Sequence, residues 1–302
     1  MNGDHDDGII DDESALTPMV KRVFASTPDA RLRTLVTAFA EHAHAFVREV
    51  GLTEAEFQAA IEFVEGIGKA NTDTHNEVVL AADVVGISTL VALLNNPTEG
   101  GQTAAALLGP FWRGNSPRCE LGANISRHET GALPMFVSGY VRDEDGEPLS
   151  GATVDVWQAS PVGLYENQDP EQPDMNLRGR FTTDAHGRYW FETVRPAGYP
   201  VPTHGPVGAL LRAQGRHPYR PAHLHFMVSR PDYKTLVTQI FADDAEHLSS
   251  DVTFGVVRSC VGHFEYREGT EADARLNRPH YVFSYDLTLH PGVSEFPTPP
   301  IK

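Results

Sequence analysis

Cysteine is nearly absent from this sequence: its 302 residues include only Cys119 and Cys260. Two cysteines exclude a disulfide framework, and they exclude a metal site built mainly from thiolates. We expect both side chains to be reduced thiols in the protein interior. This usage is typical of a cytoplasmic protein.

Basic residues are also scarce, because 24 Lys and Arg stand against 41 Asp and Glu and the formal net charge is −17. A nucleic-acid partner is not expected, since binding phosphates needs clustered Lys and Arg. Small-molecule chemistry is the favoured class. Residues 1–17 are acidic and lack hydrophobic periodicity, which predicts a mobile, solvated tail and not a signal peptide.

Long apolar runs are missing as well. The longest nearly uncharged stretch, residues 84–94, is too short to cross a bilayer, so no membrane span is expected. Apolar residues still make up 40% of the chain, which is enough to build a core. The length allows one large domain or two domains of ordinary size.

Helical periodicity is present in the N-terminal third. Apolar residues recur in steps of three and four and predict helices over 29–50, 53–66 and 77–94, with Gly51 as a stop and Thr53 and Glu56 as a capping box. We expect residues 18–105 to form a helical domain. These helices carry more apolar surface than one small bundle buries, which predicts a homodimer through this region.

After residue 105 the sequence changes to short alternating runs separated by Gly, Pro, Asp and Asn, which predicts an antiparallel β-sandwich over residues 106–302. The fold class is therefore mainly β with an α-helical N-terminal domain. Strands are expected at 136–141, 152–157, 181–183, 189–194, 223–228, 236–241 and 281–289. The first two runs, and the third with the fourth, are expected to form hairpins.

The sharpest chemical signal is His223-Leu-His225. Residues i and i+2 of a strand share one face, so both imidazoles can reach one metal ion. The alternative is a pair of partly exposed strand histidines. Because thiolates are excluded, further ligands would be His, Asp, Glu or Tyr. Tyr165 and Tyr199 both lie on predicted loops, where a single tyrosine is more often only a packed ring.

These residues also form a family pattern. The motifs are Leu164-Tyr165, Gly198-Tyr199, Arg220-Pro-Ala-His-Leu-His225, Leu108-Gly-Pro-Phe111 and Gly151-Ala-Thr-Val-Asp-Val-Trp157. Over nearly its whole length the sequence resembles the intradiol ring-cleaving dioxygenases, the catechol 1,2-dioxygenase group. The resemblance implies one non-haem Fe(III) per chain, bound by Tyr165, Tyr199, His223 and His225. It also implies a helical dimer interface that can enclose a phospholipid.

Further roles follow from the resemblance. Tyr199 would be the ligand that a catecholic diol displaces, and it would take up a substrate proton. Arg220 would stabilise negative charge on the ring; its alternative is a surface arginine paired with an acid. Gln239 matches a family position near the ligands, and a purely structural amide is the alternative.

The substrate is a finer question. Asp83 interrupts an apolar helix face, where a carboxylate needs a donor: a third substrate hydroxyl, or an internal salt bridge or backbone group. The stretch 199–208 resembles the hydroxyquinol 1,2-dioxygenase branch, which cleaves hydroxyquinol with O2 to 3-hydroxy-cis,cis-muconate, a form of maleylacetate. Catechol or chlorocatechol cleavage is the alternative, and a non-enzymatic transthyretin-like sandwich is a more distant one. The implied substrate-binding residues are Leu80, Asp83, Gly109, Pro110, Phe111, Pro200 and Val201.

Overall fold

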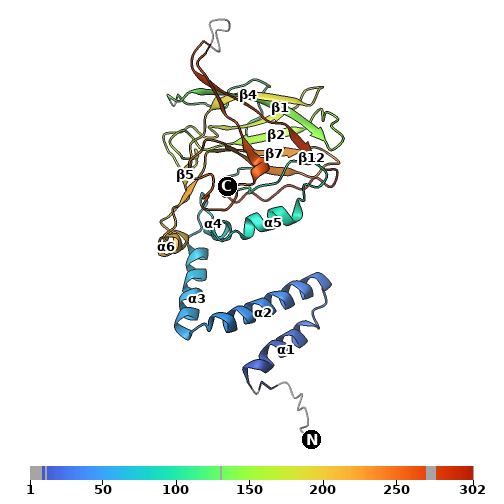
Figure 1. Cartoon of the computed structure of the whole chain (residues 1–302), viewed down its shortest axis with the longest axis vertical. Helices are drawn as coiled ribbons and strands as arrows, with labels where there is room; N and C mark the ends of the chain where they lie inside the picture. The colour runs from blue at the N-terminus through green and yellow to red at the C-terminus, as the bar shows by residue number, and fades with distance from the viewer. Residues whose placement is uncertain (1–8, 11, 130, 270–276, 302) are drawn as a thin grey trace. The chain divides into compact units, whose positions relative to one another are not determined.

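The structure is a computed structural model that describes residues 9–10, 12–129, 131–269 and 277–301. The chain forms two compact units, Met1–Val64 and Glu65–Lys302. The first is helical, and the second holds the β-sheets together with helices α4, α5 and α6 (Figure 1). The last two helices before the sheets, which end at Asn95, belong to the same unit as the sheets.

The N-terminal helices begin and end at the signals that the sequence carries. They are α1 (Glu13–Phe24), α2 (Ala30–Val50) and α3 (Glu54–Lys69). α2 follows Asp29, whose side chain accepts from the Leu32 N–H, and it ends at Gly51 in the left-handed conformation. Thr53 and Glu56 form the capping box. The Thr53 N–H donates to the Glu56 carboxylate at 2.9 Å, and the Glu56 N–H donates to the Thr53 hydroxyl at 3.3 Å.

One helix lies where the acidic tail is expected. α1 begins at Glu13, and the Asp12 side chain caps it by accepting from the Ser14 N–H at 2.8 Å. Acidic residues at this point suit the positive end of the helix dipole, so they mark a helix start there. Residues 13–17 of the expected mobile tail are therefore helical, and residues 1–8 and 11 of it lie outside the described residues.

The prediction of one continuous helix over 77–94 is wrong, because this range forms two helices, α4 (Glu77–Val84) and α5 (Ile87–Asn95). They meet at 77°, with Gly86 in the left-handed region at a φ of 77°. Apolar residues continue across the break and hide it from the sequence pattern. Within the described ranges, no single helix is long and apolar enough to cross a bilayer, and this pair meets that test only together.

Two five-stranded sheets pack face to face around the main core. Their strands are β1 (Pro134–Asp143), β4 (Arg188–Val194), β10 (Glu265–Arg267), β11 (His280–Ser284) and β12 (Leu287–Leu289) in one sheet, and β2 (Thr153–Trp157), β3 (Arg178–Thr182), β7 (His223–Ser229), β8 (Leu236–Ala242) and β9 (Val261–Gly262) in the other. Val137, Phe191 and Phe283 of the first sheet and Phe226 and Ile240 of the second are at most 1% exposed in this core. The predicted sandwich is confirmed.

The sheets are mixed and not purely antiparallel. β1 lies parallel to β11 and β12, and β8 lies parallel to β9. A separate pair, β5 (Tyr199–Pro200) and β6 (Tyr219–Arg220), flanks α6 (Pro206–Ala213) in the sequence. An alternating apolar pattern shows that one face of a strand is buried, and the pattern is the same in parallel and antiparallel strands. The sequence therefore could not reveal which strands run parallel.

Both predicted hairpins are wrong. β1 and β2 belong to different sheets, and so do β3 and β4. The turn after β1 closes as expected, with the Gly146 N–H donating to Asp143 O at 3.0 Å and a bridge between Arg142 and Pro148, but the chain then crosses to the other sheet. A tight turn carries the same residues whether it joins neighbours in one sheet or links two sheets.

Candidate active site

Strand β7 presents the two histidines of the His-x-His motif. β7 is the central partner of β2 and β8, and His225 lies opposite Trp157 on one side and Gln239 on the other. Both histidines are only 1% exposed, and the Trp157 ring stacks on His225 with centroids 4.6 Å apart. The alternative of partly exposed strand histidines is therefore excluded.

Two loops bring the tyrosines to the same place. Tyr165 follows β2, and Tyr199 begins β5, where it pairs with Arg220. Gly163 lets the loops approach closely: its φ is +80°, and a Cβ there would lie 3.1 Å from Gly198 O and 3.3 Å from the Tyr199 Cβ. Both tyrosines are almost fully buried.

The four side chains meet at their polar atoms. The Tyr165 hydroxyl lies 3.4 Å from the Tyr199 hydroxyl and 3.1 Å from His225 Nε2, and His225 Nε2 lies 3.1 Å from His223 Nε2. Among the described residues, no three His, Cys, Asp or Glu side chains gather as a metal site. A metal centre at this point would therefore depend on the two tyrosines.

The surroundings fix the protonation of these groups. His223 Nδ1 lies 2.7 Å from Pro221 O, a carbonyl that only accepts, so Nδ1 carries the proton and Nε2 a lone pair. Burial lowers the pKa of His223 to about 3 and that of His225 well below its usual value, and the Arg220 charge adds to both effects. Burial also raises the pKa of Tyr165 and Tyr199. The protein alone therefore offers two neutral imidazoles and two phenols.

A buried arginine lies beside this cluster. Arg220 is 2% exposed, and its Nη1 lies 3.4 Å from His223 Nε2. Its Nε and Nη2 donate to the Asp251 carboxylate at 3.1 Å each, and Nη2 also donates to the Gln239 carbonyl oxygen at 2.8 Å. Gln239 in turn donates to Leu107 O at 2.6 Å. Arg220 is paired with an acid, but inside the protein and not at its surface.

Asp251 is a residue beside the cluster that the sequence reasoning missed. Its carboxylate accepts from the Thr253 hydroxyl and the Gly255 N–H at 2.9 Å each, and the Arg220 charge holds its pKa below the usual value. The sequence Asp251-Val-Thr253 is a local turn signal, but nothing in it indicates a partner 31 residues earlier.

A second missed group surrounds Tyr165. The Arg178 guanidinium lies 5.9 Å from the centroid of the Tyr165 ring, and its Nε donates to the Glu166 carboxylate at 2.7 Å. Arg113 also donates to Glu166, at 3.0 Å. Arg113 lies on a loop, Glu166 directly follows Tyr165, and Arg178 begins β3, so no spacing rule in the sequence reveals this group.

A cavity of about 620 Å³ runs from helix α4 to the edge of this cluster. Its walls include Val79, Asp83, Ile87, Ser88, Val91, Leu107, Leu108, Gly109, Thr298, Pro299 and Pro300. Gly109 has a φ of +74°, and a Cβ there would lie 3.4 Å from His225 Cε1. The positive φ favours glycine at this position, and the contact places Gly109 directly beside the His225 ring.

Asp83 carries the charge of this cavity. It is 3% exposed, a hydrogen bond from Ser88 stabilises it, and burial raises its pKa to about 6. Arg220 acts in the opposite direction, lowering that pKa through its charge. A carboxylate with one neutral partner keeps further acceptor capacity for a ligand hydroxyl.

The remaining predicted substrate residues divide into three groups. Phe111 packs on Tyr165 with ring centroids 4.7 Å apart, and Pro110 beside it is buried. Leu80 and Val201 share a buried apolar cluster with Val84, Val207 and Leu211, and neither lines the cavity. Pro200 is exposed. The structure thus brings Phe111 and Gly109 to the ligand cluster and leaves Pro200 at the surface.

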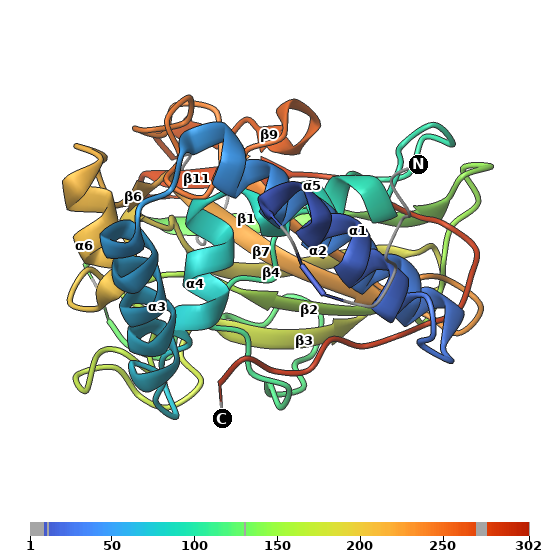
Figure 2. The same cartoon turned by 90° about the horizontal axis from the view of Figure 1, so that it is seen from below.

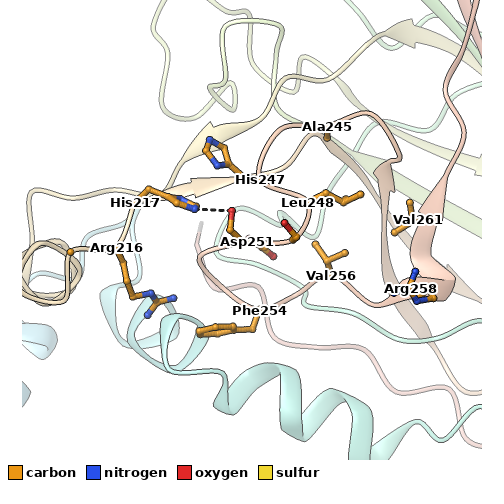
Figure 3. Close-up of a pocket in the computed structure, with 13 residues that line it drawn as sticks. Arg216, His217, Ala245, His247, Leu248, Asp251, Phe254, Val256, Arg258 and Val261 are labelled. Carbon is orange, nitrogen blue, oxygen red and sulfur yellow. Dashed lines mark hydrogen bonds between the residues drawn. The ribbon is translucent and has the colours of Figure 1, made fainter.

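A larger cavity, of about 1080 Å³, has Asp251 in its wall (Figure 3). His217, His247 and Phe254 line it, and His217 Nε2 lies 3.0 Å from the Ser250 hydroxyl. None of the four clustered donors lines either cavity, but Gly109 in the wall of the smaller one lies against His225. Volume alone therefore does not identify the reactive site in this protein.

A helical N-terminal part and a sandwich with a buried His–Tyr cluster together define a class, and known proteins of that class match this chain. Residues 109–291 match the model of the family described as Dioxygenase, and residues 29–103 match the one described as Catechol dioxygenase N terminus. The chain belongs to the intradiol ring-cleaving dioxygenase family. It is therefore an oxidoreductase, and the alternative of a non-enzymatic sandwich is wrong.

Individual relatives agree with this. A hydroxyquinol 1,2-dioxygenase of Rhizobium sp. strain MTP-10005 is 40% identical over 272 residues, 90% of this chain and 92% of that protein. A catechol 1,2-dioxygenase of Candida albicans is 37% identical and covers 91% of each chain. The structure of hydroxyquinol 1,2-dioxygenase from Pseudomonas putida DLL-E4 superposes with a TM-score of 0.86 at 36% identity, covering 93% of this chain and 99% of the other.

Proposed function

We propose that this enzyme cleaves hydroxyquinol, 1,2,4-trihydroxybenzene, between its adjacent hydroxyl-bearing carbons, using O2 to form 3-hydroxy-cis,cis-muconate, a form of maleylacetate. The observation that carries this choice is the buried carboxylate of Asp83 in a cavity that ends beside His225. Catechol has no third hydroxyl for this carboxylate to bind. The similarity to two hydroxyquinol 1,2-dioxygenases supports the same choice.

We further propose that one Fe(III) per chain binds between Tyr165, Tyr199, His223 and His225. Two buried imidazoles with facing Nε2 atoms and two phenols 3.4 Å apart fit such an ion, because phenolates are hard anionic ligands. The ferric ion supplies Lewis-acid activation of the bound diol toward O2. Metal binding would also release the phenol protons that burial otherwise retains.

The residues around the ligands then have separate tasks. Burial raises the pKa of Tyr199, so its oxygen would hold a proton from the diol whenever it is not bound to the metal. Arg220 stabilises negative charge on the ring, while Asp251 and Gln239 hold its guanidinium in position. Leu108 and Val91 give the cavity an apolar wall, which suits an aromatic ring.

A substrate panel tests the proposed function. Purified protein should contain about one iron per chain, absorb broadly in the visible through its phenolates, and cleave hydroxyquinol faster than catechol, 4-chlorocatechol or protocatechuate. The product spectrum identifies the bond that is cleaved. A preference for catechol would assign the enzyme to the alternative branch, and iron-free, colourless protein that still cleaves diols would overturn the metal site.

We also propose that the helices of the N-terminal part form a homodimer interface that can hold a phospholipid in an apolar channel. Support comes from the exposed apolar side chains of α2 and α3, among them Leu35, Phe39, Phe46, Phe57 and Ile61, which are between 49% and 75% exposed. Light scattering measures the assembly, and mass spectrometry of an organic extract detects the lipid. A monomer at micromolar concentration contradicts this proposal.

A cytoplasmic location is proposed as well. Cys119 and Cys260 are both free thiols, and Cys260 is buried. Free thiols are typical of proteins kept under reducing conditions. Fractionation of cells that express the full chain tests this location.

A further inference from the structure

Residues 296–301 read Phe-Pro-Thr-Pro-Pro-Ile, a segment for which the reaction requires no role. Proline fixes φ and has no N–H, so such a stretch is extended and partly ordered before it meets any partner. In the part of the chain that the structure describes, no backbone–backbone hydrogen bond involves residues 293–301. Side-chain packing must therefore hold this segment.

Ile301 supplies that packing. Its side chain is 5% exposed and belongs to the buried cluster of Phe111, Trp112, Trp157, Tyr165 and Tyr199. Pro299 lies against Gly114, since a Cβ on that glycine would be 3.3 Å from Pro299 Cγ. Val293, in contrast, is 75% exposed. The segment is thus anchored at Ile301, next to the proposed ligands.

Between these points the segment forms part of the cavity. Thr298, Pro299 and Pro300 line the same 620 Å³ cavity as Asp83 and Gly109. Figure 2 shows the chain before the C mark, in dark red, passing beneath β3 and ending below α4. The cavity therefore has walls from α4, α5 and residues 106–109, and a further wall, residues 298–300, that no backbone–backbone hydrogen bond holds.

We propose that residues 298–301 are a specificity-determining strap, which sets the size of the ring substituent that the cavity admits. Ile301 is its anchor, and Thr298 and Pro300 form its wall. This inference rests on the proposed function, because it takes the 620 Å³ cavity to be where the aromatic substrate binds. It adds a size limit to the charge selection by Asp83.

Three variants test the strap in the full-length, iron-loaded enzyme. Ile301→Ala removes the anchor, Thr298→Trp adds bulk at an exposed position of the wall, and Val293→Ala is the matched control on the same segment. The measured quantity is the ratio of kcat/KM for 4-tert-butylcatechol to kcat/KM for hydroxyquinol. Dissociation constants for 4-nitrocatechol without O2, iron content and the visible band are recorded for each variant.

Ile301→Ala should raise the ratio about tenfold, mainly through KM, because one or two methyl groups in an apolar pocket discriminate by about 10–200-fold. Thr298→Trp should lower it and weaken 4-nitrocatechol binding, and Val293→Ala should leave it unchanged. If Ile301→Ala does not fold, the result for Thr298→Trp decides the question. A ratio that stays within about twofold in the folded variants overturns the strap.

The same measurements separate the two proposals. A wild type that cleaves none of the diols contradicts the proposed function, whatever the variants do. A wild type that cleaves hydroxyquinol while the variants leave its selectivity unchanged contradicts only the strap. Loss of iron or of the visible band in Ile301→Ala would mean that this residue supports the ligands, which also overturns a role in selectivity.

Discussion

The two compact units of this chain bury their apolar residues in opposite ways. In the first, no described residue of α1 is buried, Ala40 is the one buried residue of α2, and Phe39 on the same helix is 75% exposed. In the second, all seven residues of β7 are buried. The sheets complete their own core, whereas the helices leave apolar side chains exposed, as the proposed dimer requires. Chemistry and assembly should therefore respond to different substitutions.

The largest effect is expected at the ligand cluster. Tyr199→Phe removes one of the proposed ligand oxygens, so activity should fall by two orders of magnitude or more, since changing even outer-shell partners costs about 10–100-fold. The visible band should shift as well. Stopped-flow kinetics and absorption spectra measure both. Tyr219→Phe, at a 43% exposed tyrosine on the neighbouring strand, is the control and should change neither.

Asp251→Asn is expected to have the next largest effect. It leaves the buried Arg220 charge without its carboxylate, which typically costs about 3–5 kcal/mol of stability. We expect kcat to fall about tenfold to a hundredfold while KM changes less, since Arg220 acts on charge that develops during the reaction. Steady-state kinetics and urea unfolding test this. Asp243→Asn, at a more exposed ion pair with His263, is the control.

Asp83→Asn should act on substrate choice. It keeps the shape and one acceptor but removes the charge, so the preference for hydroxyquinol over catechol should narrow about tenfold, within the 1.5–3 kcal/mol of a charged hydrogen bond. Iron content and colour should stay unchanged. Equal losses on both substrates would show that Asp83 is structural, and the kcat/KM ratio decides between the two results.

The pH dependence follows from the same carboxyl group. Its pKa is raised from 3.8 to about 6, so the folded protein keeps this proton in a range where the unfolded chain loses it. Stability from this group is therefore full below pH 4 and declines up to about pH 6. Above pH 6, Asp83→Asn should be more stable than wild type by up to about 3 kcal/mol. Urea unfolding at pH 5 and pH 7 tests the sign.

The smallest effect on catalysis is expected from the helices. Phe39→Asp places a charge on the exposed apolar face of α2 and should convert the proposed dimer to a monomer. The kcat/KM per chain should stay within about twofold, because this residue lies in the unit without the ligand cluster. Light scattering and kinetics are compared with Glu49→Gln on the same helix. A large loss of activity in Phe39→Asp would contradict the separation of assembly and chemistry between the two units.

How far the sequence predicted the molecule depended on the range of the interaction. Helix ends such as Gly51 and the Thr53–Glu56 box are local and were predicted correctly. His223 and His225 needed only the alternation of a strand. The two tyrosines came from the family resemblance, and no spacing rule in the sequence pointed to them.

The errors have a common physical origin. The bend at Gly86 and the crossing between β1 and β2 depend on what each segment packs against, and local residue patterns are blind to that. Asp251 was missed for the same reason, because a buried carboxylate beside Arg220 is recognisable only in three dimensions. The contribution of residues 298–301 to the cavity was equally hidden.

The strand order of the sheet that contains β1 also bears on how the protein folds. β1 cannot pair fully until β11 and β12 exist, and Met135 finds its partner at Tyr281, close to the end of the sequence. Such long-range pairing slows folding, because loop-closure entropy must be overcome before the contacts form. We therefore expect the sheet of β1, β4, β10, β11 and β12 to be completed late, after translation has passed residue 289, whereas the sheet that carries His223 and His225 can pair β2, β3, β7 and β8 before that.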